Sequence, residues 1–142
     1  MLFQTSADAR HALIDRWRWP NFAPEELACR CAGRFCAGAY WHDPVFLDRL
    51  QDLRQRMGAP IQITSGHRCA LWNAAAGGAP RSQHKRIAAD IALRGHDRMR
   101  LLDAATAAGF GGIGLASTFL HLDGRTRRAT WFYEGSRELW QI

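Results

Sequence analysis

Residues 109–123 read GFGGIGLASTFLHLD and contain two short apolar runs with a brief link between them. These runs predict two neighbouring strands, at residues 113–116 and 119–123. Alternate side chains of a strand point to opposite faces, so the two leucines of the second run enter a core while His121 and Asp123 lie together on the other face. This stretch therefore predicts a small sheet with a polar site on one face.

The flanking sequence alternates between helical and strand patterns. Helices are expected at residues 7–17, 23–28, 43–57 and 97–108, a short helix within 71–82, and further strands at 61–64, 87–93 and 129–133. The best-marked helix has Asp43 as a suitable N-cap, Pro44 next to it and Gly58 at its end. The mixed order and the short links between strands indicate an α+β fold, with a small antiparallel sheet flanked by helices.

Length and composition favour one ordinary domain. The chain has 142 residues, 47% of them hydrophobic, which is enough to form a stable core without disulfide or metal cross-links. We expect a single domain over 1–142, with the helices and the cysteine-rich loop of residues 1–42 packed on it. The apolar runs are far shorter than the roughly 20 residues of a membrane span, so none is expected.

The charge balance is basic. Nineteen lysine and arginine residues against 13 acidic ones give a net charge of +6, which favours acidic partners such as the anionic bacterial envelope. The arginines are scattered along the chain rather than gathered on one recognition helix, so no nucleic-acid partner is expected. The first residues, MLFQTSADAR, do not resemble a signal peptide, and we expect synthesis in the cytoplasm.

A second His/Asp pair, His84 and Asp90, lies at the edge of the predicted strand 87–93. Either pair alone is a weak signal, because a histidine beside an apolar strand is more often a hydrogen-bonded structural residue. Together with His121, however, the second pair supplies two imidazoles and a carboxylate. That is the ligand set of a catalytic zinc whose fourth position is left for water.

The four cysteines form a separate group. Cys29, Cys31 and Cys36 lie in one glycine-containing loop, and Cys69 follows Arg68. Four thiolates would complete a structural zinc site that pins the loop to the sheet. Disulfides, buried thiols and an iron–sulfur cluster remain alternatives.

Residues 61–69 read IQITSGHRC, and the motifs SQH at 82–84 and AAD at 88–90 follow before the glycine-rich stretch 109–123. In this order and at about this spacing, the motifs resemble the M15 metallopeptidases, specifically the D-Ala-D-Ala carboxypeptidase-like branch with murein endopeptidases and phage endolysins. The resemblance covers residues 22–131. It implies an α+β domain with zinc on an antiparallel sheet, a fold shared with lysostaphin-type enzymes and hedgehog signalling domains.

The resemblance also implies roles for particular residues. The zinc ligands fall on His84, Asp90 and His121. Asp123 would orient the site or act as general base, and in the predicted mechanism it takes the proton of the attacking water. Arg68 would face the active site and hold a substrate carboxylate, because its guanidinium group can hydrogen-bond to both carboxylate oxygens. Ser82 is expected to contact substrate.

Two departures from the family pattern stand out. His84 and Asp90 are six positions apart, one fewer than is usual in relatives, and His67 stands where relatives have tyrosine. A residue lost within a strand would turn every later side chain to the wrong face. Asp90 can therefore face the metal only if the turn after His84 absorbs the missing residue.

These observations predict a zinc-dependent peptidase that cuts stem peptides or cross-links of peptidoglycan and derives from a phage or prophage. It would reach the cell wall through a holin-made lesion or as a virion component among phage tail or particle proteins. One alternative is a non-catalytic structural or wall-binding protein of a phage-like particle with the same fold. Another is a nucleic-acid-binding domain built around the cysteine loop.

Overall fold

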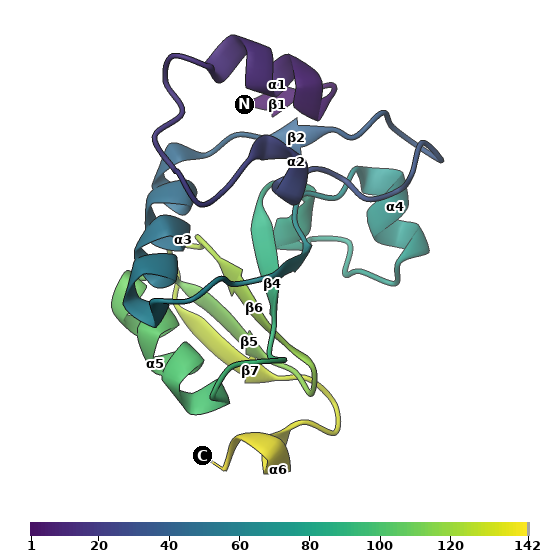
Figure 1. Cartoon of the computed structure of the whole chain (residues 1–142). Coiled ribbons are helices and arrows are strands. Elements are labelled where there is room, and N and C mark those ends of the chain that lie inside the picture. The colour runs from purple at the N-terminus through teal and green to yellow at the C-terminus, as the bar shows by residue number, and fades with distance from the viewer. Residues whose placement is uncertain (142) are drawn as a thin grey trace.

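A five-stranded sheet occupies the centre of the computed structural model, which describes residues 1–141 (Figure 1). Its strands, in spatial order, are β3 (Ile63–Ser65), β4 (Ala88–Ala92), β6 (Phe119–Asp123), β5 (Gly112–Leu115) and β7 (Ala129–Phe132). Neighbouring strands are antiparallel except β5 and β7, which run parallel. The expected α+β fold is confirmed. The last strand, β7, pairs in parallel, whereas every other pair of strands in this sheet is antiparallel.

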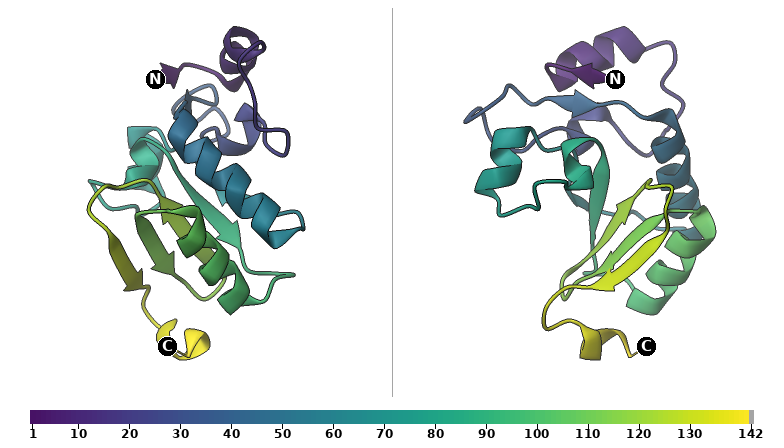
Figure 2. Two further views of the ribbon diagram at one scale, coloured as in Figure 1. Left: turned by 90° about the vertical axis from the view of Figure 1, so that its left-hand side faces the viewer. Right: turned by 180° about the vertical axis from the view of Figure 1, so that it is seen from behind.

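Two long helices, α3 (Pro44–Met57) and α5 (Arg98–Ala108), lie side by side on one face of this sheet (Figure 2). The carboxylates of Asp43 and Asp97 accept backbone N–H groups in the first turns of the two helices. Gly58 and Gly109 end them in the left-handed conformation, with φ of 62° and 91°. Both helices thus begin and end close to the positions that their sequence signals predict.

The core lies between the sheet and these helices. Leu120 and Leu122 of β6 are fully buried there, together with Leu50 and Leu53 of α3. Because β6 alternates its side chains, His121 between the two leucines points to the opposite face of the sheet. The face without the long helices is therefore the one that carries the polar residues.

The N-terminal helices are short. Helix α1 (Ser6–Leu13) ends before residue 17, where the sequence pattern predicted its end, because Arg16 N–H bonds back to Leu13 O in a turn. Helix α2 (Pro24–Leu27) ends against β3, where a Cβ on Gly66 would collide with the backbone of Leu27. Ala9 and Leu13 of α1 and Leu27 of α2 belong to the same hydrophobic cluster as the sheet and α3.

Several short elements were not anticipated from the sequence. They are β1 (Leu2–Phe3), its antiparallel partner β2 (Tyr40–Trp41), the 3₁₀ turn η1 (Gln83–Lys85) and α6 (Arg137–Trp140). Two to four residues are too few to show a hydrophobic period. Trp140 of α6 is fully buried, and its indole N–H donates to Ala116 O at 2.9 Å. The short helix expected within 71–82 is α4 (Ala70–Ala75), which begins one residue earlier.

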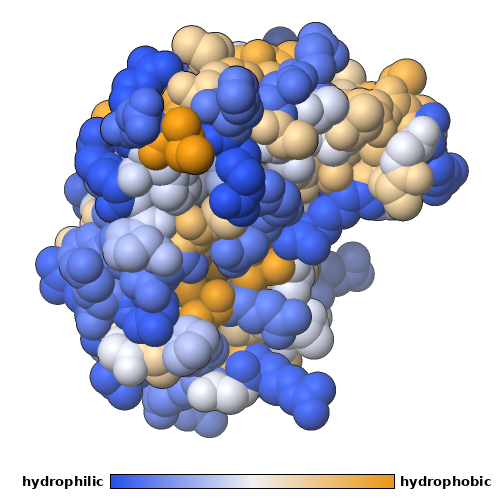
Figure 3. Space-filling model, turned by 45° about the horizontal axis from the view of Figure 1, so that its top comes forward, coloured by the Kyte–Doolittle hydropathy of each residue, from blue (hydrophilic) through white to orange (hydrophobic). Residues whose placement is uncertain are grey.

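The surface is mostly polar. Hydrophilic residues cover much of the face seen in Figure 3, and hydrophobic residues show there as small patches between them. Within residues 1–141, none of the helices has the length and apolar character that crossing a membrane requires.

Candidate metal centre

Three side chains converge on the sheet face that α3 and α5 leave uncovered. His84 Nε2 and His121 Nδ1 each lie 3.1 Å from Asp90 Oδ1, and the two ring nitrogens are 3.2 Å apart. Asp90 on β4 and His121 on β6 are direct cross-strand partners, so the sheet register itself sets their separation. All three residues are buried.

The turn after His84 accommodates the short interval before Asp90. Ser82 Oγ accepts the backbone N–H of His84 at 3.1 Å and so begins η1, which presents the imidazole. Arg86 then leaves the helical region, with φ of −108° and ψ of −99°, and β4 begins at Ala88. The missing residue is absorbed before the strand, and Asp90 faces the two histidines.

The second nitrogen of each imidazole is held by an acceptor. His84 Nδ1 donates to Gly66 O at 2.7 Å, and His121 Nε2 donates to Asp123 Oδ2 at 2.7 Å. A neutral imidazole that donates from one nitrogen has a lone pair on the other. With both imidazoles neutral, three electron-pair donors face one another, counting the Asp90 carboxylate, and a metal cation between them would satisfy all three; without a metal, a proton on an imidazole does so by donating to Asp90.

The geometry and charge of this donor set fit zinc. Zinc–nitrogen and zinc–oxygen bonds of about 2.0–2.1 Å in a tetrahedron place the ligand atoms about 3.4 Å apart. Burial alone would raise the pKa of Asp90, but hydrogen bonds from His121 and His84 lower it to about 2. Burial lowers the pKa of His121, but Asp123 and Asp90 outweigh burial and raise it. The carboxylates thus favour a positive charge at this point.

Asp123 lies behind His121 rather than beside the ligand atoms. Its side chain is completely buried, and its carboxylate accepts hydrogen bonds from His121 Nε2 and from Nε and Nη2 of Arg125. These bonds outweigh burial and hold the pKa of Asp123 well below its usual range. Of the two roles predicted for Asp123, general base and orienting carboxylate, the general-base role stays a prediction, since the carboxylate is enclosed and already paired with His121 and Arg125. Its position fits the orienting role.

Arg68 lies on the open side of the three ligand atoms. Its Nη2 is 3.8 Å from Asp90 Oδ2, and its Nε donates to Ser65 Oγ at 3.2 Å. The buried Asn73 accepts from Nη1 at 3.5 Å and donates to Ala79 O. The Arg68 side chain remains 18% exposed, which leaves part of the guanidinium accessible to a ligand.

A cavity of about 520 Å³ opens over this centre. It is lined by Arg68, Gly77, Gly78, Ser82, Gln83, His84, Asp90, Phe119, His121, Arg125, Trp131 and Tyr133, among others. Among the described residues 1–141, Asp90 is its only carboxylate. Ser82 lines the wall, and its hydroxyl caps the turn that carries His84, so the substrate contact expected of it stays a prediction.

A sequence model described as Peptidase M15 matches residues 20–123, which is most of the chain. The chain belongs to the peptidase M15 family. The resemblance seen in the sequence motifs is thereby confirmed, and membership identifies the chain as a metallopeptidase-family protein. No curated protein sequence matches it.

An aromatic wall of this M15 family member was missed by the sequence analysis. The Trp131 ring lies 5.3 Å from the His121 ring, and the Arg125 guanidinium lies 4.7 Å above Trp131. Tyr133 follows at the next residue on the same face and lies 5.2 Å from Phe119. The period-two spacing of Trp131 and Tyr133 in the predicted strand 129–133 was the available signal.

Two glycines of β5 leave room for the site in this M15 family member. A Cβ at Gly112 would collide with the Asp123 carboxylate, and one at Gly114 would lie 2.8 Å from the rings of Trp131 and Tyr133. These glycines pair directly with Asp123 and His121 across the sheet. The glycine spacing of residues 109–123 therefore reflects clearance for side chains on neighbouring strands.

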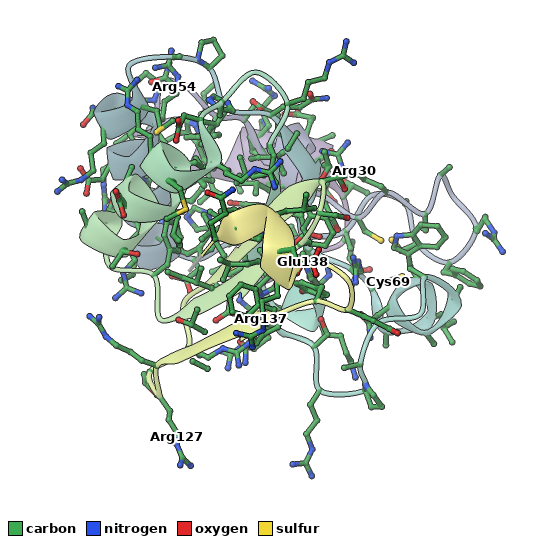
Figure 4. The ribbon with its side chains drawn as sticks, turned by 90° about the horizontal axis from the view of Figure 1, so that it is seen from below. Arg30, Arg54, Cys69, Arg127, Arg137 and Glu138 are labelled. Atoms are coloured by element: carbon green, nitrogen blue, oxygen red, sulfur yellow. The ribbon has the colours of Figure 1, made fainter. Side chains whose placement is uncertain are left out.

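A second hollow of about 580 Å³ adjoins the cavity and shares Gln83 and Arg125 with it. Four arginines line this hollow: Arg86, Arg125, Arg127 and Arg128. Arg127 projects from the loop between β6 and β7 away from the body of the molecule (Figure 4). In this M15 family member, positive charge therefore extends from the metal centre along one side of the surface.

Proposed function

We propose that the chain is a zinc-dependent peptidase that hydrolyses a peptide bond in peptidoglycan stem peptides or cross-links. The observation that supports this most strongly is the convergence of His84 Nε2, Asp90 Oδ1 and His121 Nδ1 in a cavity that is also lined by Arg68. Three protein ligands leave the fourth position of a tetrahedral zinc site open. Zinc held there would supply Lewis acidity, which polarises a carbonyl and makes water more acidic.

Arg68 provides a binding group for a substrate carboxylate. Peptidoglycan stem peptides carry free carboxylates, and a guanidinium pairs with both oxygens of such a group. Asn73 and Ser65 hold the guanidinium from behind, so it is oriented before substrate arrives. Arg68 would thereby place the neighbouring peptide bond over the three ligand atoms.

Tyr133, which lines the same cavity, supplies a hydrogen-bond donor. Burial and the charge of Asp90 raise the pKa of its phenol, so the hydroxyl stays protonated at neutral pH. A protonated phenol can donate to a substrate carbonyl or to the oxygen that gains charge during attack. Asp123 keeps His121 in the tautomer that directs Nδ1 toward the centre.

The proposal extends to where the enzyme acts. The net charge of +6 and the arginine-lined hollow would concentrate the protein on an anionic cell wall. Origin in a phage or prophage, synthesis in the cytoplasm and access to the wall through a holin-made lesion or as a virion component belong to the same proposal. Peptidoglycan is its proposed partner, and no nucleic-acid partner is proposed.

Digestion of purified murein sacculi tests the function. Zinc-loaded protein should release muropeptides whose mass spectra show one new amino and one new carboxyl end at a defined bond. His84→Ala should release none, while His11→Ala, on the exposed side of α1, should match the parent protein. If zinc binds at the centre but intact sacculi are only bound and not cut, the non-catalytic wall-binding alternative replaces the proposal.

A further inference from the structure

All four cysteines of the chain gather at a second point, apart from the three-ligand centre. Cys29, Cys31 and Cys36 belong to the loop between α2 and β2, and Cys69 is the N-cap residue of α4. Their Sγ atoms all lie within 4.8 Å of one another, and those of Cys31 and Cys36 are 3.5 Å apart. Figure 4 shows Cys69 on the side of the molecule where this loop lies.

The spacing matches one metal ion at the centre of four thiolates. Zinc–sulfur bonds of about 2.3 Å in a tetrahedron place the sulfurs about 3.8 Å apart. An iron–sulfur cluster puts several irons and sulfides between its thiolates and would hold them farther apart. Two separate disulfides would bring the sulfurs together in pairs rather than as one group of four.

Backbone N–H groups point at the sulfurs from both segments. Cys36 N–H donates to Cys31 Sγ at 3.4 Å, Ala39 N–H to Cys36 Sγ at 3.5 Å, and Cys69 N–H to Cys29 Sγ at 3.4 Å. Such donors stabilise sulfur when it carries negative charge, as a metal-bound thiolate does. Ala32 and Gly33 take positive φ after Cys31, and this reversal of the chain brings Cys36 back to it.

We propose that Cys29, Cys31, Cys36 and Cys69 bind a second zinc ion in a closed structural site. Four protein ligands leave no position for substrate, so this zinc does not take part in hydrolysis. It ties the N-terminal loop to the residue that follows Arg68, and Arg68 N–H in turn donates to His84 O at 2.6 Å. The second zinc thereby holds in place the turn that carries the substrate-binding arginine.

Metal counting separates the two sites. The full-length protein, reconstituted with zinc without oxygen and then desalted, should retain two zinc ions per chain, and His84→Ala should retain one. Because the four cysteines are the only ones in the chain, an organomercurial reagent should release that remaining zinc in step with the modification of four thiols. Released zinc is read with a metallochromic dye.

Cobalt provides a readout that requires no cysteine substitution. His84→Ala loaded with Co²⁺ should show thiolate-to-cobalt charge-transfer bands and the intense visible bands of tetrahedral cobalt. The deciding measurement is this His84→Ala spectrum. Cys31→Ser is a supporting variant: where the His84→Ala bands are present, loss of charge-transfer intensity or failure to fold in Cys31→Ser agrees with the proposal. A His84→Ala protein with four free thiols and no bound zinc overturns it, as does purified protein with two disulfides or with iron and labile sulfide at this site.

Discussion

The two ligand clusters of this molecule are built in opposite ways. The His84, Asp90 and His121 centre takes two ligands from paired strands of the sheet and opens into a cavity. The cysteine cluster takes all four ligands from loops and the start of a short helix, and its two innermost members, Cys29 and Cys31, are buried. One cluster offers three ligands and an open position, and the other offers four.

This difference matches two different roles, a site for catalysis and a site that stabilises the fold. An open three-ligand site needs rigid geometry before the metal arrives, and the sheet register and the hydrogen bonds of Gly66 and Asp123 provide it. A closed four-ligand site can itself create the geometry, because metal binding supplies folding free energy to loops that have little core of their own. Loss of metal should therefore have different consequences at the two places.

The largest expected effect is on hydrolysis. His121→Ala removes one of three ligands and should reduce cleavage of sacculi by at least about 10³-fold, since a metal contributes several kcal/mol to transition-state stabilisation. The near-ultraviolet circular dichroism should still report a folded protein, because the sheet and not this metal supplies the core. Unchanged turnover by His121→Ala would contradict the assignment of the open site.

Asp123→Asn sharpens the distinction between a residue that orients a ligand and one that moves protons. We expect zinc affinity at the open site to fall about 10- to 100-fold, because the amide no longer anchors His121 Nε2 as a carboxylate does. Competition with a zinc chelator measures this affinity. If Asp123 acts as the general base, the substitution should instead lower kcat and leave zinc affinity unchanged, and that result would overturn the orienting role.

Gly112→Ala tests the clearance on β5. The new methyl group would collide with the Asp123 carboxylate, so the free energy of unfolding should fall by about 1–3 kcal/mol and zinc affinity at the open site should fall with it. Thermal unfolding and chelator competition measure the two effects. Gly124→Ala is the matched control, because a Cβ there meets only Arg49 Nη1, at 3.6 Å. The proposed zinc of the cysteine cluster should remain in both variants.

The zinc-free protein should lose stability in acid through the open site. The pKa of Asp90 is lowered from 3.8 to about 2 in the folded state, so its contribution is complete above pH 3.8 and is lost as the pH falls toward 2. The loss should be on the order of 2 kcal/mol, measured by urea unfolding of zinc-free protein across this range. Asp90→Asn should flatten the plot of unfolding free energy against pH in this range. An equally steep plot for the variant would show that Asp90 is not the group that titrates there.

The smallest expected effect concerns Arg68. Arg68→Lys keeps the charge but loses the two-pronged contact, so kcat/KM should fall about tenfold, mainly through KM, for a substrate with a carboxylate beside the cleaved bond. A substrate whose carboxylate is amidated should be affected much less. Arg127→Lys, on the exposed loop, is the control, and equal losses with both substrates would remove Arg68 from carboxylate recognition.

Much of the local structure could be predicted from the chain alone. The caps and stripe of residues 43–57 predicted α3, and alternation in residues 119–123 placed His121 and the two leucines on opposite faces. These predictions succeeded because caps and periodicity act over a few neighbouring residues, where the backbone geometry is nearly constant. The family motifs also led to the three residues that the fold brings together.

Only the tertiary structure decided how residues from distant elements meet. It placed Asp123 behind His121, joined β7 in parallel so that Trp131 lines the cavity, and brought Cys69 to the loop of Cys29. Each of these outcomes depends on strand order, register and packing across the chain. The sequence alone determined which residue types were available and which face of each element they occupy, whereas their distances and their hydrogen-bond partners follow from the way the elements pack together.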